Sequence, residues 1–103
     1  DISILASLNA EGNSLFMMES MACGIPVICT NVGGLTEIVT NNHTGLLVDR
    51  NNIKVELQIA MQKLIEDENL RSRIGKNASI HINQNLNINI MIRKLDKYLQ
   101  NFL

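Results

Sequence analysis

Short apolar runs alternate with polar, turn-forming segments over the first half of the chain. Three of these runs are rich in Ile, Val or Leu: Ile2 to Leu5, Val27 to Cys29 and Leu46 to Val48. Apolar runs of this length predict buried strands. Between the first two runs, nearly every residue of 15–23 is apolar or small. This stretch predicts a helix that is buried on most sides and ends at Gly24.

Turn-forming residues separate the second strand from the third. Gly33 and Gly34 predict a flexible turn, 35–39 predicts a short helix, and the cluster 41–45 predicts a turn that leads into the third strand. Because strands alternate with helices, we expect a parallel sheet with helices on its faces, an α/β fold of Rossmann-like type.

The second half of the chain has the apolar spacing of three helices. The first has an apolar face formed by Ile53, Leu57, Ala60 and Leu64. Asp67 is expected to cap the second, whose inward stripe is Leu70, Ile74 and Ala78. Asn87 is expected to cap the last, whose inward residues are Ile88, Met91, Leu95 and Tyr98 or Leu99. No linker or repeat divides the 103 residues into separate domains.

Composition excludes several classes of protein. Nine basic and ten acidic residues are scattered along the chain and give a net charge of −1, so no positive stripe is present to bind nucleic acid. The longest apolar stretch, 21–29, contains Gly24 and Pro26 and is too short to span a membrane. Cys23 and Cys29 lack redox or zinc-ligand spacing, and we interpret both as reduced core thiols of a cytoplasmic protein.

The loop after the first strand and the start of the next helix are the candidate binding site. In open α/β sheets, ligands bind beyond the carboxyl ends of the strands, where a loop meets a helix N-terminus. Gly12 permits close backbone approach, and the first helical N–H groups, near Ser14 to Phe16, favour a phosphate.

Two carboxylates flank this phosphate position, Glu11 in the loop and Glu19 in the helix. A carboxylate beside a phosphate needs a different partner, and sugar hydroxyls are suitable because ionised carboxylates accept paired O–H donors. Phosphate on the helix and hydroxyls on the carboxylates together indicate a nucleotide sugar. The alternative to ligand binding, for each glutamate, is a solvated side chain near a helix start.

The segment from Glu11 to Ile28 resembles the Glu-x7-Glu signature of retaining GT-B glycosyltransferases of group 1, or family 4. Ser20 stands where that family more commonly has Ala. The similarity continues through 30–39 and 44–48, so it covers about half of the chain densely. The resemblance implies that 1–103 is part of the C-terminal nucleotide-sugar-binding domain of such an enzyme.

This resemblance implies a role for each residue of the motif. Glu11 would bind hydroxyls of the donor hexose and stabilise positive charge developing at its anomeric carbon. Glu19 would bind the ribose hydroxyls. The backbone expected to border the sugar and diphosphate is that of Gly12, Asn13, Ser14 and Leu15. No metal or other cofactor is expected, because basic groups and a helix dipole offset the diphosphate charge in such enzymes.

The family's activity is transfer of a sugar from a nucleotide sugar to an acceptor with retained anomeric configuration, as in polysaccharide biosynthesis. Its phosphate-binding Arg and Lys, and its N-terminal acceptor-binding domain, correspond to sequence upstream of these 103 residues. We therefore expect the isolated chain to be inactive, and we leave peripheral membrane association open for the parent protein only. The alternatives are a non-catalytic nucleotide-binding module or truncated remnant, and a nucleotide-sugar epimerase.

Other candidate residues favour structural roles. His43, in a turn, and His81, near a helix end, have no partner carboxylate at useful spacing and are expected at the surface. Met17, Met18 and Met21 are expected to pack in the core.

Overall fold

A small parallel sheet organises the chain. The computed structural model describes residues 1–5, 14–32, 38–85 and 88–100. Within these ranges three strands are hydrogen-bonded in the order β1-β2-β3, all parallel. They are β1 (Ser3–Leu5), β2 (Val27–Thr30) and β3 (Leu46–Val48). The strands predicted from the apolar runs are thus confirmed, and their carboxyl ends share one edge of the sheet.

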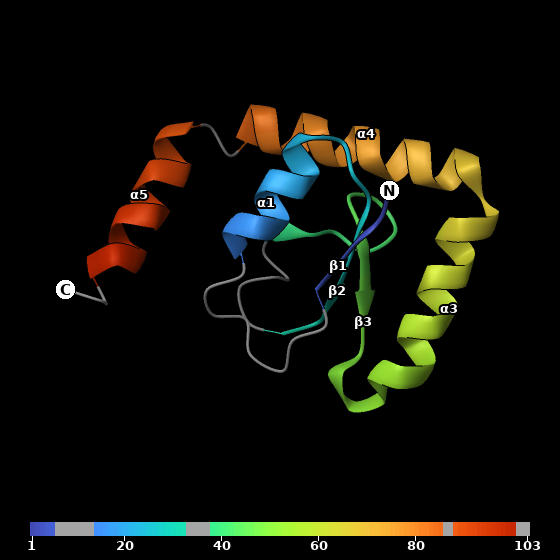
Figure 1. Cartoon of the computed structure of the whole chain (residues 1–103). Helices are drawn as coiled ribbons and strands as arrows, with labels where there is room; N and C mark the ends of the chain where they lie inside the picture. The colour runs from blue at the N-terminus through green and yellow to red at the C-terminus, as the bar shows by residue number, and fades with distance from the viewer. Residues whose placement is uncertain (6–13, 33–37, 86–87, 101–103) are drawn as a thin grey trace.

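Helices cover the sheet, as the alternating pattern predicts. They are α1 (Ser14–Ala22), α3 (Ile53–Glu66), α4 (Glu68–Asn85) and α5 (Ile88–Gln100), and a single 3-10 turn, Arg50–Asn52, precedes α3. Figure 1 shows α1 and α3 on opposite sides of the strands and α4 across the end where the strands begin. The predicted α/β fold with a parallel sheet is therefore confirmed.

Some predicted features lie outside the described residues. These are the turn at Gly33 and Gly34, most of the short helix over 35–39, and the cap Asn87.

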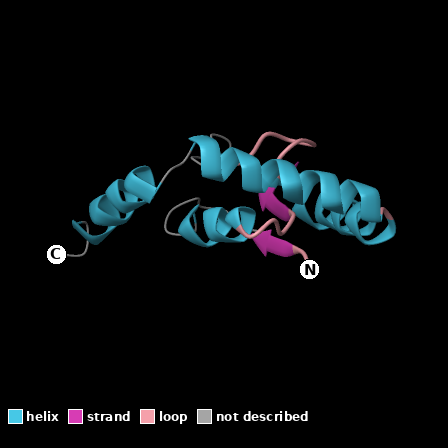
Figure 2. Ribbon diagram, turned by 90° about the horizontal axis from the view of Figure 1, so that it is seen from above, coloured by secondary structure: helices cyan, strands magenta, loops and turns pink. Residues whose placement is uncertain are grey.

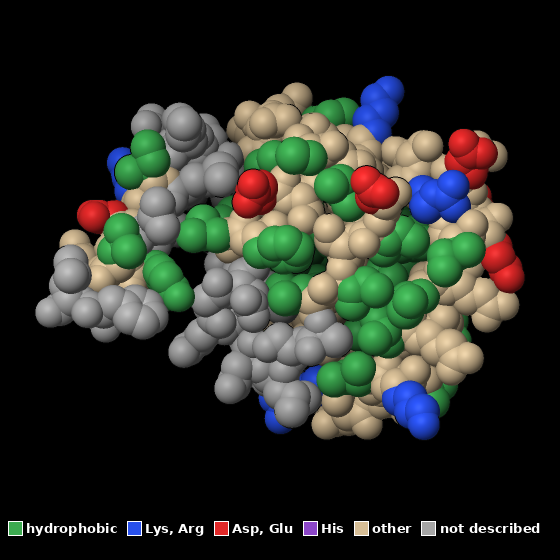
Figure 3. All heavy atoms as spheres, viewed as in Figure 1, with side chains coloured by type: hydrophobic (Ala, Val, Ile, Leu, Met, Phe, Trp, Pro, Cys, Tyr) green, Lys and Arg blue, Asp and Glu red, His purple; other side chains and the backbone are tan. Residues whose placement is uncertain are grey.

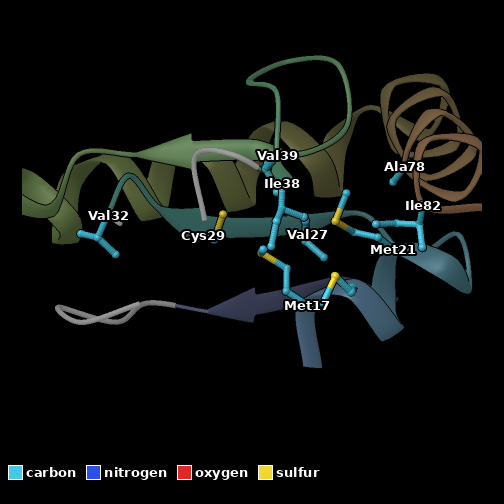
Figure 4. Close-up of a cluster of buried hydrophobic side chains, with 10 residues drawn as sticks. Met17, Met21, Val27, Cys29, Val32, Ile38, Val39, Ala78 and Ile82 are labelled. Carbon is cyan, nitrogen blue, oxygen red and sulfur yellow. The ribbon is translucent and has the colours of Figure 1, made fainter. Parts of the chain in front are cut away.

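The central strand β2 is buried on both faces, which is typical of parallel sheets between helices. Its residues alternate between two apolar clusters. Val27 and Cys29 pack with the α1 methionines and with Ala78 and Ile82 of α4 (Figure 4). Ile28 packs instead in the second cluster, whose other buried members are Leu46, Val48, Ala60, Leu64 and Ile74. Residues of α4 belong to both clusters, so this helix ties the two sides of the sheet together.

The end of α1 is fixed by backbone hydrogen bonds and by α4. Gly24 has a φ of 76°, and the N–H groups of Gly24 and Ile25 donate to the carbonyls of Met21 and Ser20. This pair of bonds is the Schellman arrangement, which favours glycine because φ is positive. Gly75 of α4 lies so close that a Cβ there would overlap the Gly24 carbonyl oxygen. The predicted stop at Gly24 is confirmed, and α4 packs directly upon it.

The junction between α3 and α4 uses two side chains. The Asp67 carboxylate accepts a hydrogen bond from the Leu70 N–H at 3.0 Å, which confirms the predicted cap. The guanidinium of Arg71 donates to the carbonyls of Leu64 and Ile65, at 2.7 and 2.8 Å, in the last turn of α3. Free backbone groups at the end of α3 and at the start of α4 thus have hydrogen-bond partners within the junction.

The last helix does not pack on the sheet. Figures 1 and 2 show α5 set apart from the strands beyond the end of α4. Tyr98 is 39% exposed and Leu99 48%, so the prediction that one of them faces inward is wrong. Helical periodicity predicts an apolar face but not the surface that covers it, and here the strands do not cover it. No helix in the described part of the chain is long and apolar enough to cross a membrane.

Candidate functional site

The candidate site lies at the edge of the sheet where the strands end. β1 ends at Leu5, and α1 begins at Ser14 and runs back toward the start of β2 (Figure 1). The N-terminus of α1 therefore stands at the carboxyl edge, as ligand binding in this fold class requires. Glu11, Gly12 and Asn13 lie outside the described residues, so their predicted contacts stay predictions.

Helix α1 is held on one side by a buried face. Met17, Met18 and Met21 are almost completely buried, which confirms their predicted place in the core. Ser20 is also buried, and its hydroxyl oxygen accepts a hydrogen bond of 3.0 Å from the hydroxyl of Ser3 in β1. These contacts fix the rotation of α1 about its own axis, so the opposite face of the helix has a defined direction.

That opposite face consists of Phe16, Glu19 and Cys23, all exposed. Their spacing of three and four residues places them in one stripe along the helix. Glu19 is the only charged residue of α1, and its carboxylate has no hydrogen-bond or ion-pair partner among the described residues. Leu15 is half-buried and packs against the core. Of the six predicted site residues, the structure thus places Glu19 on an open surface and Leu15 beside the core.

Other acidic side chains near this edge are engaged locally. The Asp49 carboxylate, just after β3, accepts from the N–H of Asn51 at 2.9 Å. The Glu56 carboxylate accepts from the N–H of Asp49 at 3.1 Å. These two groups stabilise the turn into α3, whereas the Glu19 carboxylate has no partner among the described residues.

One prediction for the α1 region is corrected. Cys23 is exposed and is not a core thiol, whereas Cys29 is buried as predicted and neither thiol is in a disulfide. The predicted burial of this helix on most sides is confirmed, and Phe16, which is 53% exposed, lies on its open face. The 16, 19, 23 spacing around Glu19 is the signal that could have identified this stripe, because residues three or four apart share a helix face.

The two histidines lie at the edge of the sheet where the strands begin. His43, in the turn before β3, and His81, in α4, line one hollow of about 210 Å³. The Asn77 amide donates to the His43 carbonyl at 3.0 Å and lies 3.4 Å from its Nδ1. His43 is exposed as predicted, but His81 is half-buried, because α4 crosses the sheet beside this turn.

Metal-ligating side chains do not gather in the part of the chain that the structure describes. No three His, Cys, Asp or Glu residues there are placed to hold a metal ion together. The expectation of metal-free ligand binding stays a prediction.

The parallel sheet and its flanking helices make this chain an α/β protein, and its structure matches glycosyltransferases of the GT-B class. The model of the family Glycosyl transferases group 1 matches residues 1–81. The chain therefore belongs to the group 1 glycosyl transferases.

Individual relatives agree with this family. The capsular polysaccharide biosynthesis glycosyltransferase CapM of Staphylococcus aureus is 33% identical over 93 residues, which are 90% of this chain and 24% of CapM. The C-terminal domain of a glycosyl transferase group 1 protein from Francisella tularensis has a TM-score of 0.72 and 33% identity, with 85% of this chain and 44% of that chain covered. A sucrose-phosphate synthase from Thermosynechococcus elongatus has a TM-score of 0.69 and 35% identity, with 85% and 22% covered. The chain thus spans about a quarter or less of CapM and of the synthase chain, and less than half of the Francisella chain.

Proposed function

We propose that this chain forms the donor-binding part of a glycosyltransferase that transfers a sugar from a nucleotide sugar with retention of anomeric configuration. The observation that carries the proposal is the direction of Glu19. It is the single charged residue of a helix that is otherwise anchored in the core, and it is exposed on the face of α1 that carries Phe16. A carboxylate that has no partner among the described residues suits the paired hydroxyls of a ribose.

The remaining roles follow from the family motif. Glu11 binds hydroxyls of the transferred sugar and stabilises the positive charge that develops when the glycosidic bond breaks. The backbone of Gly12, Asn13, Ser14 and Leu15 borders the diphosphate, which the free N–H groups at the start of α1 favour. The donor binds without a metal ion, and the acceptor is held by another part of the protein.

We also infer that the chain is part of a larger C-terminal domain. Within the described ranges β1 pairs only with β2, so its other edge is open, and Ile4 on this strand is 39% exposed. The matched C-terminal domain is more than twice as long as the aligned part, because only 44% of it is covered. The proposed upstream half would cover β1 and supply the basic groups that bind the diphosphate.

A ligand screen tests this proposal. The full-length protein that contains this chain is titrated with UDP, GDP and ADP sugars in a thermal-shift assay, followed by calorimetry. A ligand that binds only the native state raises the unfolding temperature, so one nucleotide series should give a clear increase. The matched control is Glu19→Gln, which keeps the size of the side chain and loses the charge; its increase should be smaller. If no nucleotide sugar shifts the unfolding temperature, the proposal is wrong.

A further inference from the structure

We propose that the ring of Phe16 packs against the nucleoside of the donor, so that Phe16 and Glu19 hold one nucleoside together. This inference rests on the proposed function, because it takes the Glu19 surface as the nucleotide site. It adds a binding residue that the family motif does not specify and that the apolar sequence of 15–23 does not predict.

The first argument is the position of Phe16 in α1. Phe16 and Glu19 are three residues apart and both exposed, so they lie on one face, separated by about 4.5 Å along the helix axis. Side chains of a helix lean toward its N-terminus, so the Glu19 carboxylate leans toward Phe16 and the ring leans toward the first turn. A ligand that reaches from the start of α1 to Glu19 passes directly over this ring.

The second argument is the exposure of the ring itself. The neighbours Met17 and Met18 are fully buried, so the rotation of α1 is fixed and Phe16 stays outside the core while 53% of its surface is in water. Aromatic side chains gain more from burial than most residues, and an exposed ring next to an open carboxylate is typical of an amphipathic ligand surface.

The third argument is chemical complementarity. A nucleoside has hydroxyls on one edge of the ribose and apolar faces on the ribose and base. The carboxylate of Glu19 accepts from the hydroxyls, and an aromatic ring stacks on an apolar face. The apolar face of the ribose is the same in every nucleotide, so Phe16 would contribute affinity without choosing among nucleotides.

The protein offers a matched control for an exposed apolar residue. Ile59 of α3 is 60% exposed, and α3 lies on the other side of the sheet from α1 (Figure 1). Truncating Ile59 removes a similar exposed side chain away from the proposed nucleoside position.

The experiment compares Phe16→Ala, Phe16→Tyr, Ile59→Ala and Glu19→Ala in the full-length protein. Binding of UDP, GDP and ADP is measured by calorimetry, and unfolding temperature and donor kinetics are measured alongside. We expect Phe16→Ala to weaken binding of the preferred nucleotide about tenfold or more and to raise the donor KM by a similar factor, with the unfolding temperature nearly unchanged. Phe16→Tyr, which keeps the ring, should restore binding to within threefold, and Ile59→Ala should bind normally.

Three results would overturn this inference. If Glu19→Ala loses nucleotide binding and Phe16→Ala binds normally, the proposed function stands and the role of Phe16 is wrong. If Phe16→Ala lowers the unfolding temperature and Phe16→Tyr does not restore binding, the ring packs against protein instead. Normal binding in both Phe16→Ala and Glu19→Ala would reject the proposed function as well.

Discussion

The two cysteines show how strongly the surroundings of a residue determine its chemistry. Cys29 lies in the central strand, and burial raises the pKa of its thiol from 9.0 to about 12. Cys23 lies on the exposed stripe of α1 with Phe16 and Glu19. The thiolate is the reactive form, so the two positions should react at very different rates.

We predict selective alkylation of Cys23. Iodoacetamide at pH 8 should modify Cys23 while Cys29 stays protected, because Cys29 is both buried and protonated below pH 12. Peptide mass spectrometry after a timed reaction measures both sites, and denaturation before labelling should make them react alike. Equal labelling in the native protein would mean that β2 is not buried as described.

At the scale of elements, local signals made the helix ends predictable. Gly24 and Asp67 each act through hydrogen bonds within a few residues, so the sequence alone identifies them as a stop and a cap. The face of α1 that is open and the placement of α5 depend on segments distant in sequence. The sequence therefore does not single out Phe16 as exposed, and the prediction that Tyr98 or Leu99 faces inward is wrong, since both are exposed.

The contact between Gly75 and Gly24 also depends on distant segments, and it gives a prediction. Gly75→Ala should destabilise the protein by about 1–3 kcal/mol, because the new Cβ would overlap the Gly24 carbonyl oxygen and force α4 away from α1. Urea unfolding measures the change. Ser72→Ala, on an exposed position one turn earlier in α4, is the control and should be neutral or slightly stabilising. Equal stability of the two variants would contradict the close helix contact.

At the scale of the whole molecule, exposed apolar side chains form a candidate interaction surface. Figure 3 shows hydrophobic side chains gathered over the strands and α3 on the side that faces the viewer. Ile4 and Ile65 are among the exposed apolar residues. Apolar patches of this kind commonly mark interaction sites. The motif predicted the family, but the extent of this open surface depends on packing that the sequence pattern does not contain.

We predict that the purified 103-residue chain catalyses no sugar transfer. The proposed donor surface holds one half of the site, and the basic groups that neutralise the diphosphate and the groups that bind the acceptor lie elsewhere in the proposed enzyme. Incubation with radiolabelled UDP, GDP and ADP sugars and a panel of acceptors tests this directly, with the full-length protein as the positive control. Turnover by the short chain alone would show that it contains a complete active site.

The central claim is that Glu11 and Glu19 contact different parts of one donor, and steady-state kinetics of two variants test it most directly. Glu19 is assigned to the ribose, which changes little during reaction, so Glu19→Ala should mainly raise the donor KM. Glu11 is assigned to the transferred sugar, where charge develops, so Glu11→Ala should mainly lower kcat, by a factor on the order of 10².

Both variants are assayed in the full-length protein over a donor concentration series, with free nucleotide binding measured in parallel. His43→Ala is the control, because His43 lies at the opposite end of the strands, and its donor affinity should stay within a few-fold of the wild type. The account predicts weakened nucleotide binding only for Glu19→Ala and a strongly reduced kcat only for Glu11→Ala. Normal nucleotide binding by Glu19→Ala, or full kcat in Glu11→Ala, would contradict it.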